Sequence, residues 1–314
     1  MNEEDLFDQN PWWRGRENIF HDPKVKKFDG ASIKWEPRMK RCFHLEEGLV
    51  YTLRGPRQVG KTTLLKNLIR YELIKKRADP YSIFYFSSDL IDKKEELLEL
   101  IALYEKIADR FGVKGRRKIL IDEITNVRDW EKAIKYLRDT GKGKDHTFIL
   151  TGSHSIDIKK SVERLPGRRG EGSGHILNKI LVPMKFSEYI GTVDKELAKD
   201  LSEILSLHSE DRIRMIKDLS NGKMDGSIER LNSVYSRELD KWLDSYLLSG
   251  GIPVPIEHLV SGGSIPNDVY GIYVRSLMGD LARWGMKERI AKQIIRSVIE
   301  KMTTKVSLNA IAKE

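Results

Sequence analysis

The stretch Arg54-Gly55-Pro56-Arg57-Gln58-Val59-Gly60-Lys61-Thr62-Thr63 fits the pattern G-x-x-x-x-G-K-[ST] of a phosphate-binding P-loop. Residues 48–53 before it form an apolar run typical of a buried strand. Residues 64–73 after it are apolar at helical spacing. The motif therefore lies between a predicted strand and a predicted helix, and this context supports the match.

The loop chemistry explains the spacing. Glycines let the backbone curl so that successive N–H groups point at phosphate oxygens, and the N-terminus of the following helix adds partial positive charge. Lys61 would reach the β- and γ-phosphates, and Thr62 would ligate Mg²⁺. The alternative is an ordinary strand-to-helix loop with an exposed lysine. The predicted nucleotide-binding residues are Gly55, Pro56, Arg57, Gln58, Val59, Gly60, Lys61, Thr62 and Thr63.

Two further strands are predicted to end at the same site. Residues 119–121 are apolar and, within the run 118–121 that reads as a buried strand, lead into Asp122 and Glu123. Because ligands lie at the carboxyl ends of parallel strands, Asp122 would hold Mg²⁺ and Glu123 would polarise the attacking water. The alternative is that both carboxylates simply begin a loop or helix. The run 146–153 reads as another strand, whose end offers Ser153, or second Thr151, as a sensor of the γ-phosphate.

The segment Leu165-Pro166-Gly167-Arg168-Arg169-Gly170 places two arginines after these strands. Arginine near a γ-phosphate stabilises the charge that develops during its transfer. Arg168, and also Arg169, are therefore candidates for this role, within one chain or across a subunit interface. A solvated basic loop is the alternative.

Taken together, the chain resembles the P-loop ATPases of archaea and bacteria classed in the AAA superfamily, whose C-terminal half is a domain of unknown function. The resemblance covers about residues 10–300 and implies ATP binding and hydrolysis without a known biological process. It rests on the motifs at 54–63, 121–123, 150–153, 165–168, 182–189 and 246–253.

Members of this family commonly continue into a winged helix-turn-helix. Here residues 288–302 read as a helix, 303–307 as a turn and 308–314 as the start of a second helix. The sequence therefore predicts an incomplete winged helix-turn-helix without its recognition helix, which puts DNA reading by that module in doubt. Terminal helices packed on the core are the alternative.

Strand and helix patterns alternate between residues 46 and 195. Strands are expected near 49–54, 83–87, 118–122, 147–151 and 176–182, with helices near 61–76, 92–110 and 129–140. This alternation predicts an α/β fold, a three-layer P-loop NTPase with a parallel five-stranded sheet, followed by a mostly helical C-terminal domain. The predicted divisions are an N-terminal segment packing on the ATPase core (1–45), the P-loop domain (46–195), a helical domain (196–287) and the incomplete winged helix (288–314).

Tryptophans 12 and 13 in the N-terminal segment could stack on adenine, but a hydrophobic anchor is the expected role. The single cysteine, Cys42, rules out an intrachain disulfide and is expected in the core. One cysteine, a polar N-terminus and no long apolar stretch predict a cytoplasmic protein that does not interact with membranes. The net charge of +9 leaves nucleic-acid contact open. The seven histidines are dispersed and show no zinc-ligand spacing.

Three functional hypotheses follow. The first is Mg²⁺-dependent ATP hydrolysis coupled to conformational change, acting on an unknown DNA or protein partner. The second is a nucleotide-gated protein or DNA binding module with negligible turnover. The third is a small-molecule kinase, which the adjacent pair Asp122 and Glu123 fits less well than water attack. A homo-oligomer, and a preference for ATP over GTP, are left open.

Overall fold

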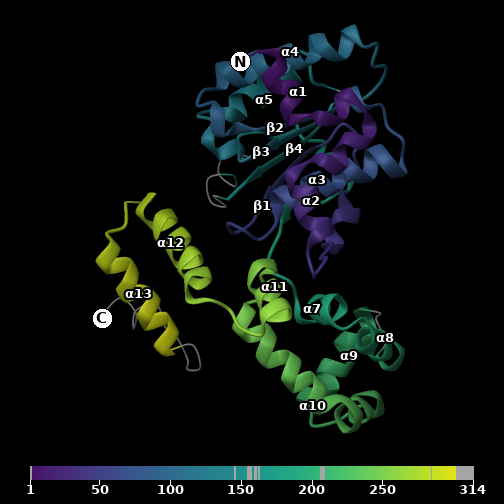
Figure 1. The fold of residues 1–314 in the computed structure, drawn as a ribbon, viewed down its shortest axis with the longest axis vertical. Coiled ribbons are helices and arrows are strands. Elements are labelled where there is room, and N and C mark those ends of the chain that lie inside the picture. The colour runs from purple at the N-terminus through teal and green to yellow at the C-terminus, as the bar shows by residue number, and fades with distance from the viewer. Residues whose placement is uncertain are drawn as a thin grey trace. The chain divides into compact units, whose positions relative to one another are not determined.

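The computed structural model describes residues 2–144, 146–153, 158, 161, 163–205, 209–283 and 285–301 (Figure 1). They fall into two compact units, one within Met1–Gly263 and the other within Ser264–Glu314. The first unit contains the sheet, the P-loop and the first helices that follow the sheet. The predicted divisions at residues 46, 196 and 288 stay predictions.

Five strands form one sheet in the order β2-β3-β4-β1-β5. Every neighbouring pair is parallel, which confirms the predicted fold class. Strand β4 thus lies between β1, which leads into the P-loop, and β3, which ends at Asp122. The strands are β1 (Val50–Arg54), β2 (Ile83–Ser87), β3 (Lys118–Asp122), β4 (Thr147–Gly152) and β5 (Asn178–Ile180).

Helices cover both faces of the sheet. The connection from β1 to β2 runs outward to one edge, whereas the next two connections return toward β1. Because such crossovers are right-handed, the first helix lies on one face and the other two on the opposite face. Figure 1 shows α2 and α3 on one side of the sheet and α4 and α5 on the other. These helices are α2 (Pro23–Gly30), α3 (Lys61–Arg70, continued by a π-helical turn, Tyr71–Lys75), α4 (Lys94–Arg110) and α5 (Trp130–Asp139).

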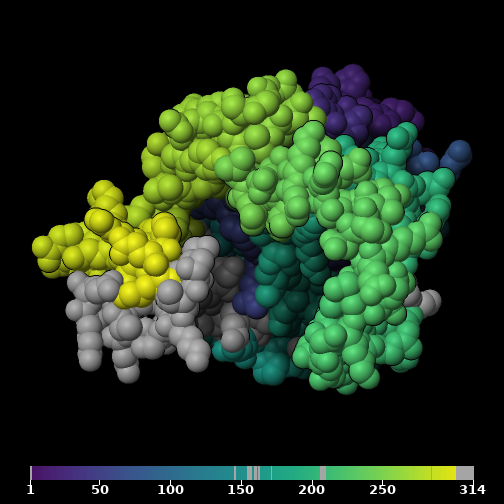
Figure 2. All heavy atoms as spheres, turned by 90° about the horizontal axis from the view of Figure 1, so that it is seen from below, coloured from purple at the N-terminus to yellow at the C-terminus, as the bar shows by residue number. Residues whose placement is uncertain are grey.

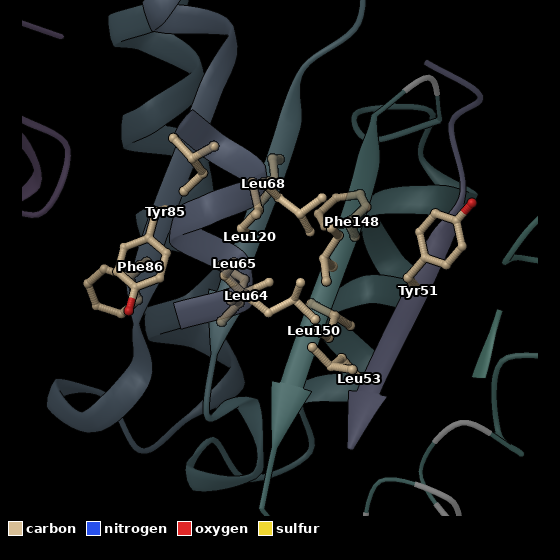
Figure 3. Packing of buried hydrophobic residues seen from close by; sticks show 14 of the residues in the cluster. Tyr51, Leu53, Leu64, Leu65, Leu68, Tyr85, Phe86, Leu120, Phe148 and Leu150 are labelled. Atoms are coloured by element: carbon tan, nitrogen blue, oxygen red, sulfur yellow. The ribbon is translucent and has the colours of Figure 1, made fainter. Parts of the chain in front are cut away.

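The core lies between the sheet and these helices. Strands β1 to β4 are buried almost along their whole length, which explains their continuous apolar sequences. On α3, Leu64, Leu65 and Leu68 are buried together and lie among the leucines of β3 and β4 in Figure 3. Each such side chain contributes about 2 kcal/mol through its burial. The helix that begins at Lys61 is thereby held in a fixed position on the sheet.

The N-terminal segment packs along the edge strand β2. It includes α1 (Glu3–Gln9), and the buried side chain of Asn10 binds the backbone of Tyr85 in both directions, at 2.7 and 2.9 Å. Gln9 accepts a hydrogen bond from the N–H of Ser87 at 2.8 Å. These amides take the place of a neighbouring strand, so the edge of the sheet is covered.

The two adjacent tryptophans anchor this segment. Trp12 and Trp13 are buried, and both indole N–H groups donate to the carbonyl of Ile83, at 3.1 and 3.0 Å. The structure therefore supports the anchoring role and places neither ring where adenine could stack. Cys42 is exposed, so the expectation that it is a core residue is wrong. It ends a short 3₁₀ helix, Arg38–Cys42, which has no buried residue.

A helical region follows β5 in the first unit. Its helices are α7 (Phe186–Val193), α8 (Lys195–Ile204), α9 (Ser209–Ser220), α10 (Gly226–Ser249) and α11 (Pro253–Gly262). Figure 2 shows these helices in shades of green in a space-filling view. Tyr189 lies against Trp242 and Tyr246, which joins α7 to α10. Gly251 approaches the backbone so closely that a Cβ there would lie 2.5 Å from the carbonyl oxygen of Met184, and its own carbonyl accepts the N–H of Met184 at 2.8 Å.

The second unit contains α12 (Asn267–Arg283) and α13 (Glu288–Lys301), which confirms the helix expected from residue 288. The turn and second helix expected over 303–314 lie outside the described residues. Within the part of the chain that the structure describes, no helix combines the length and apolar character that crossing a bilayer requires.

Candidate active site

The P-loop connects the end of β1 to the start of α3. Gly55 passes so close to β5 that a Cβ there would lie 2.2 Å from the carbonyl oxygen of Leu181, so only glycine fits. Gln58 and Gly60 have φ of 60° and 104°, which turns the backbone into the left-handed region before the helix begins. Val59 is buried and fixes the middle of the loop.

Lys61 is the first residue of α3, and its side chain is buried. Its Nζ donates to the carbonyl oxygens of Gly55 and Pro56, at 3.0 and 3.1 Å, and to Ser153 Oγ at 2.9 Å. Burial lowers the pKa of Lys61, against the opposing effect of Glu123, whose Oε1 lies 3.7 Å from Nζ, and of Asp122. The lysine therefore links the loop to the ends of β3 and β4.

Asp122 lies buried at the end of β3 and contacts Thr62 directly. The hydroxyl of Thr62 donates to Asp122 Oδ2 at 2.6 Å, and Thr151 at the end of β4 donates to Oδ1. A threonine hydroxyl beside a carboxylate provides oxygen ligands of the kind that Mg²⁺ prefers. The two residues predicted to hold the metal thus fit it, and they come from segments 60 residues apart.

Glu123 is the next residue, and it has a left-handed backbone with φ of 53°. This conformation costs a non-glycine residue on the order of 1 kcal/mol, and local hydrogen bonds offset that cost. The N–H of Glu123 donates to Thr151 Oγ1 at 3.1 Å. Its carboxylate accepts from both the N–H and the hydroxyl of Ser153, at 3.0 and 2.7 Å. Glu123 and Ser153 are therefore held together by hydrogen bonds beside Lys61.

Tyr85 was not found by sequence reasoning, although it contacts the site. From the middle of β2, its buried hydroxyl donates to Asp122 Oδ2 at 3.2 Å. Burial and the nearby carboxylate raise the pKa of Tyr85, so the hydroxyl keeps its proton. Ser88 donates to the carbonyl oxygen of Asp122 at 2.7 Å. Both residues orient Asp122 from the side of β2.

The buried ion pair of Lys66 and Asp22 packs against the ring of Tyr85. The ammonium of Lys66 lies 3.3 Å from the ring centroid of Tyr85 and 2.9 Å from Asp22 Oδ2. Burial lowers the pKa of Lys66, whereas Asp22 opposes this shift. Asp22 also caps α2 by accepting the N–H of Lys24 at 2.8 Å. The N-terminal segment is thus connected to Asp122 through Lys66 and Tyr85.

The structure does not bring the two candidate arginines to the P-loop of their own chain. Arg168 pairs with Asp139 at the end of α5, with Nε 2.6 Å from Oδ1. Buried Arg169 donates to the carbonyl oxygen of Val50 at 3.1 Å. Val50 starts β1, so this segment lies at the amino edge of the sheet, opposite the P-loop. A role for Arg168 across a subunit interface stays a prediction.

Comparison with known proteins agrees with this geometry. Residues 47–190 match the model of an AAA domain. An uncharacterized protein of Methanocaldococcus jannaschii is 27% identical over 210 residues, which cover 60% of this chain and 42% of that protein. The chain thus spans less than half the length of this curated relative.

Two solved structures are weakly similar. A Walker-type ATPase of Pyrococcus abyssi gives a TM-score of 0.43 at 14% identity, covering 99% of this chain and 89% of the other. Thermotoga maritima RuvB gives 0.31 at 18% identity, covering 95% and 81%. Since both TM-scores are below 0.5, the similarity to an AAA domain rests on the match of residues 47–190. Residues 47–190, which carry the P-loop, Asp122 and Glu123, are similar to an AAA domain.

Proposed function

We propose that this chain binds ATP with Mg²⁺, hydrolyses it, and uses the cycle to change the arrangement of its helical region. The observation that carries the proposal is the convergence of Thr62, Asp122, Glu123 and Ser153 around Lys61 at one edge of the sheet. Thr62 and Asp122 would hold Mg²⁺, which supplies charge neutralisation at the phosphate oxygens.

Each residue has a distinct role in the proposed reaction. The backbone N–H groups of the loop and Lys61 bind the phosphates, so that charge developing on them is stabilised. Glu123 accepts a proton from the attacking water, and Ser153 links Glu123 to Lys61. Their positions support the roles proposed for Glu123, Lys61, Ser153, Thr62 and Asp122.

The proposed coupling has a short route through backbone contacts and hydrogen bonds. Gly55 of the P-loop lies against the carbonyl of Leu181, whose N–H donates to the carbonyl of Arg54 at 2.8 Å. Three residues later, Met184 is bound to Gly251 and to the hydroxyl of Tyr246. A shift of the loop upon phosphate loss would therefore be transmitted directly to α10 and α11.

The test combines three proteins in a phosphate-release assay with Mg²⁺. Lys61→Ala should abolish ATP binding, and Glu123→Gln should retain bound ATP without hydrolysis. The exposed Glu99→Gln, on α4, serves as the matched control and should turn over normally. Normal turnover by Glu123→Gln would show that another group activates water.

One observation favours the nucleotide-gated module as a second candidate. Both carboxylate oxygens of Glu123 accept hydrogen bonds from Ser153, so Ser153 holds the orientation of the carboxylate that would accept the proton. Ser153→Ala separates the two candidates. If Ser153 is a sensor, the variant should lose hydrolysis. If Ser153 restrains Glu123, slow wild-type turnover should accelerate in the variant.

The partner and the assembly are also proposals. The net charge of +9 supports a DNA partner, for which ATPase assays with and without DNA are the test, and a protein partner is the alternative. A homo-oligomer would let Arg168 reach the site of a neighbouring copy. Mixing inactive Lys61→Ala and Arg168→Ala proteins should then restore some activity, and no recovery would remove this role. The cytoplasmic location stays a prediction.

A further inference from the structure

Three side chains of types that can bind a metal ion lie close together outside the P-loop site. They are His44 and Glu47, in the segment before β1, and His175, in the segment before β5. Strands β1 and β5 are parallel neighbours, with Thr52 opposite Asn178. The segments that precede them therefore emerge at the same amino edge of the sheet. Glu47 and His175, although 128 residues apart in sequence, are brought into direct contact.

The ligand atoms are already close to one another. His175 Nε2 lies 2.8 Å from Glu47 Oε2, and His44 Nδ1 lies 3.7 Å from Glu47 Oε1. The two imidazole rings stack with centroids 4.0 Å apart. One ligand atom from each side chain can be chosen so that all lie within 4.8 Å of one another. Tetrahedral zinc with bonds of about 2.0–2.1 Å places its ligand atoms roughly 3.3 Å apart. A small rotation of the rings would therefore bring the three groups around one ion.

The backbone that carries His44 and Glu47 is held in place by hydrogen bonds. The N–H of His44 donates to the hydroxyl of Tyr51 at 3.1 Å. Thr147 Oγ1 donates to the carbonyl of Leu45 at 2.8 Å and accepts from the N–H of Gly48 at 3.1 Å. Phe43 and Leu45, on either side of His44, are buried, whereas His44 is exposed. The segment is thus fixed with the imidazole directed to the surface.

We propose that His44, Glu47 and His175 form a binding site for a divalent transition metal such as Zn²⁺. Two imidazoles and a carboxylate are a common zinc ligand set, which leaves a fourth position for water or another group. Imidazole favours zinc, copper and nickel over Mg²⁺, which prefers oxygen ligands. The site is therefore chemically distinct from Thr62 and Asp122, and it lies at the opposite edge of the sheet.

A bound ion would join the segment before β1 to the segment before β5. Ligands that bind the folded chain and not the unfolded chain raise its stability by mass action. Because β5 is the edge strand next to β1, the ion would hold the start of β5 against the start of β1.

The test is calorimetric titration of ZnCl₂ into the nucleotide-free full chain, in buffer with excess Mg²⁺ to occupy oxygen sites. Binding of one Zn²⁺ per chain is expected, with a rise in the thermal unfolding temperature. Co²⁺ should give the visible absorption of a low-symmetry, four-coordinate site. The variants His44→Asn, Glu47→Gln and His175→Asn should each weaken binding by about tenfold or more.

The controls are His21→Asn and Cys42→Ser, both exposed and outside the cluster, and they should bind Zn²⁺ as the wild type does. Unchanged metal-free unfolding temperatures in the three ligand variants would show that they fold. Equal Zn²⁺ affinity in wild type and His175→Asn would overturn the proposal, as would binding that Cys42→Ser abolishes. None of these measurements depends on ATP hydrolysis.

Discussion

Removal of one buried hydroxyl, in Tyr85→Phe, should lower the apparent affinity for Mg²⁺ during nucleotide binding. The hydroxyl donates to Asp122 Oδ2 at 3.2 Å, while Thr62 occupies the same oxygen at 2.6 Å. A hydrogen bond to a charged acceptor contributes about 1.5–3 kcal/mol. Since Thr62 remains, we expect the lower limit, about 1.5 kcal/mol, which corresponds to about a tenfold loss in apparent Mg²⁺ affinity.

The matched control is Tyr104→Phe, which removes a hydroxyl from another buried tyrosine. That hydroxyl donates to the backbone carbonyl of Tyr81 at 3.0 Å, away from Asp122. Both variants should lower the free energy of unfolding by about 1 kcal/mol. Only Tyr85→Phe should shift the Mg²⁺ midpoint, measured by binding of a fluorescent ATP analogue across a magnesium titration. Identical midpoints for the two variants would refute a positioning role for Tyr85.

Three further changes test the surrounding structure. Asn10→Ala removes both hydrogen bonds to the edge strand and should lower the free energy of unfolding in urea by about 2–3 kcal/mol; a loss below about 0.5 kcal/mol would contradict the covering role. Lys66→Met leaves the buried carboxylate of Asp22 without its cation partner and should cost about 3 kcal/mol, partly recovered by adding Asp22→Asn. Burial alone would raise the pKa of Glu257, but backbone N–H donors near α2 outweigh it and hold the pKa below its ordinary value. Its stabilising effect is therefore present at neutral pH and lost as pH falls through the folded-state pKa, so wild type and Glu257→Gln should differ in unfolding temperature at pH 7 and converge near pH 3.

The strands and the P-loop could be read from the sequence because their signals are local. A buried parallel strand is a continuous apolar run, and all five strands lie within a few residues of the predicted ranges. The polar residues Asp122, Glu123 and Ser153 were found because each directly follows such a run. Parallel pairing then places the ends of β1, β3 and β4 at one edge, so their convergence could also be anticipated.

Tyr85 and Arg168 show where this reasoning fails. Tyr85 lies inside an apolar strand, and nothing local distinguishes a packing ring from one whose hydroxyl reaches Asp122. Arg168 follows the site strands in sequence, yet the chain there returns to the amino edge, where the N–H of Val50 donates to the carbonyl of Arg169 at 3.1 Å. Position in sequence does not reveal the direction in which a loop runs.

What the sequence determined by itself is the P-loop core, because each of its motifs is a short segment whose chemistry is complete within a few residues. The joining of His44 and Glu47 to His175 was decided only by the tertiary structure. Dispersed histidines carry no spacing signal, and the parallel register of β1 with β5 is what brings their segments together. Contacts of this kind depend on how whole strands pair, and no short stretch of sequence contains that information.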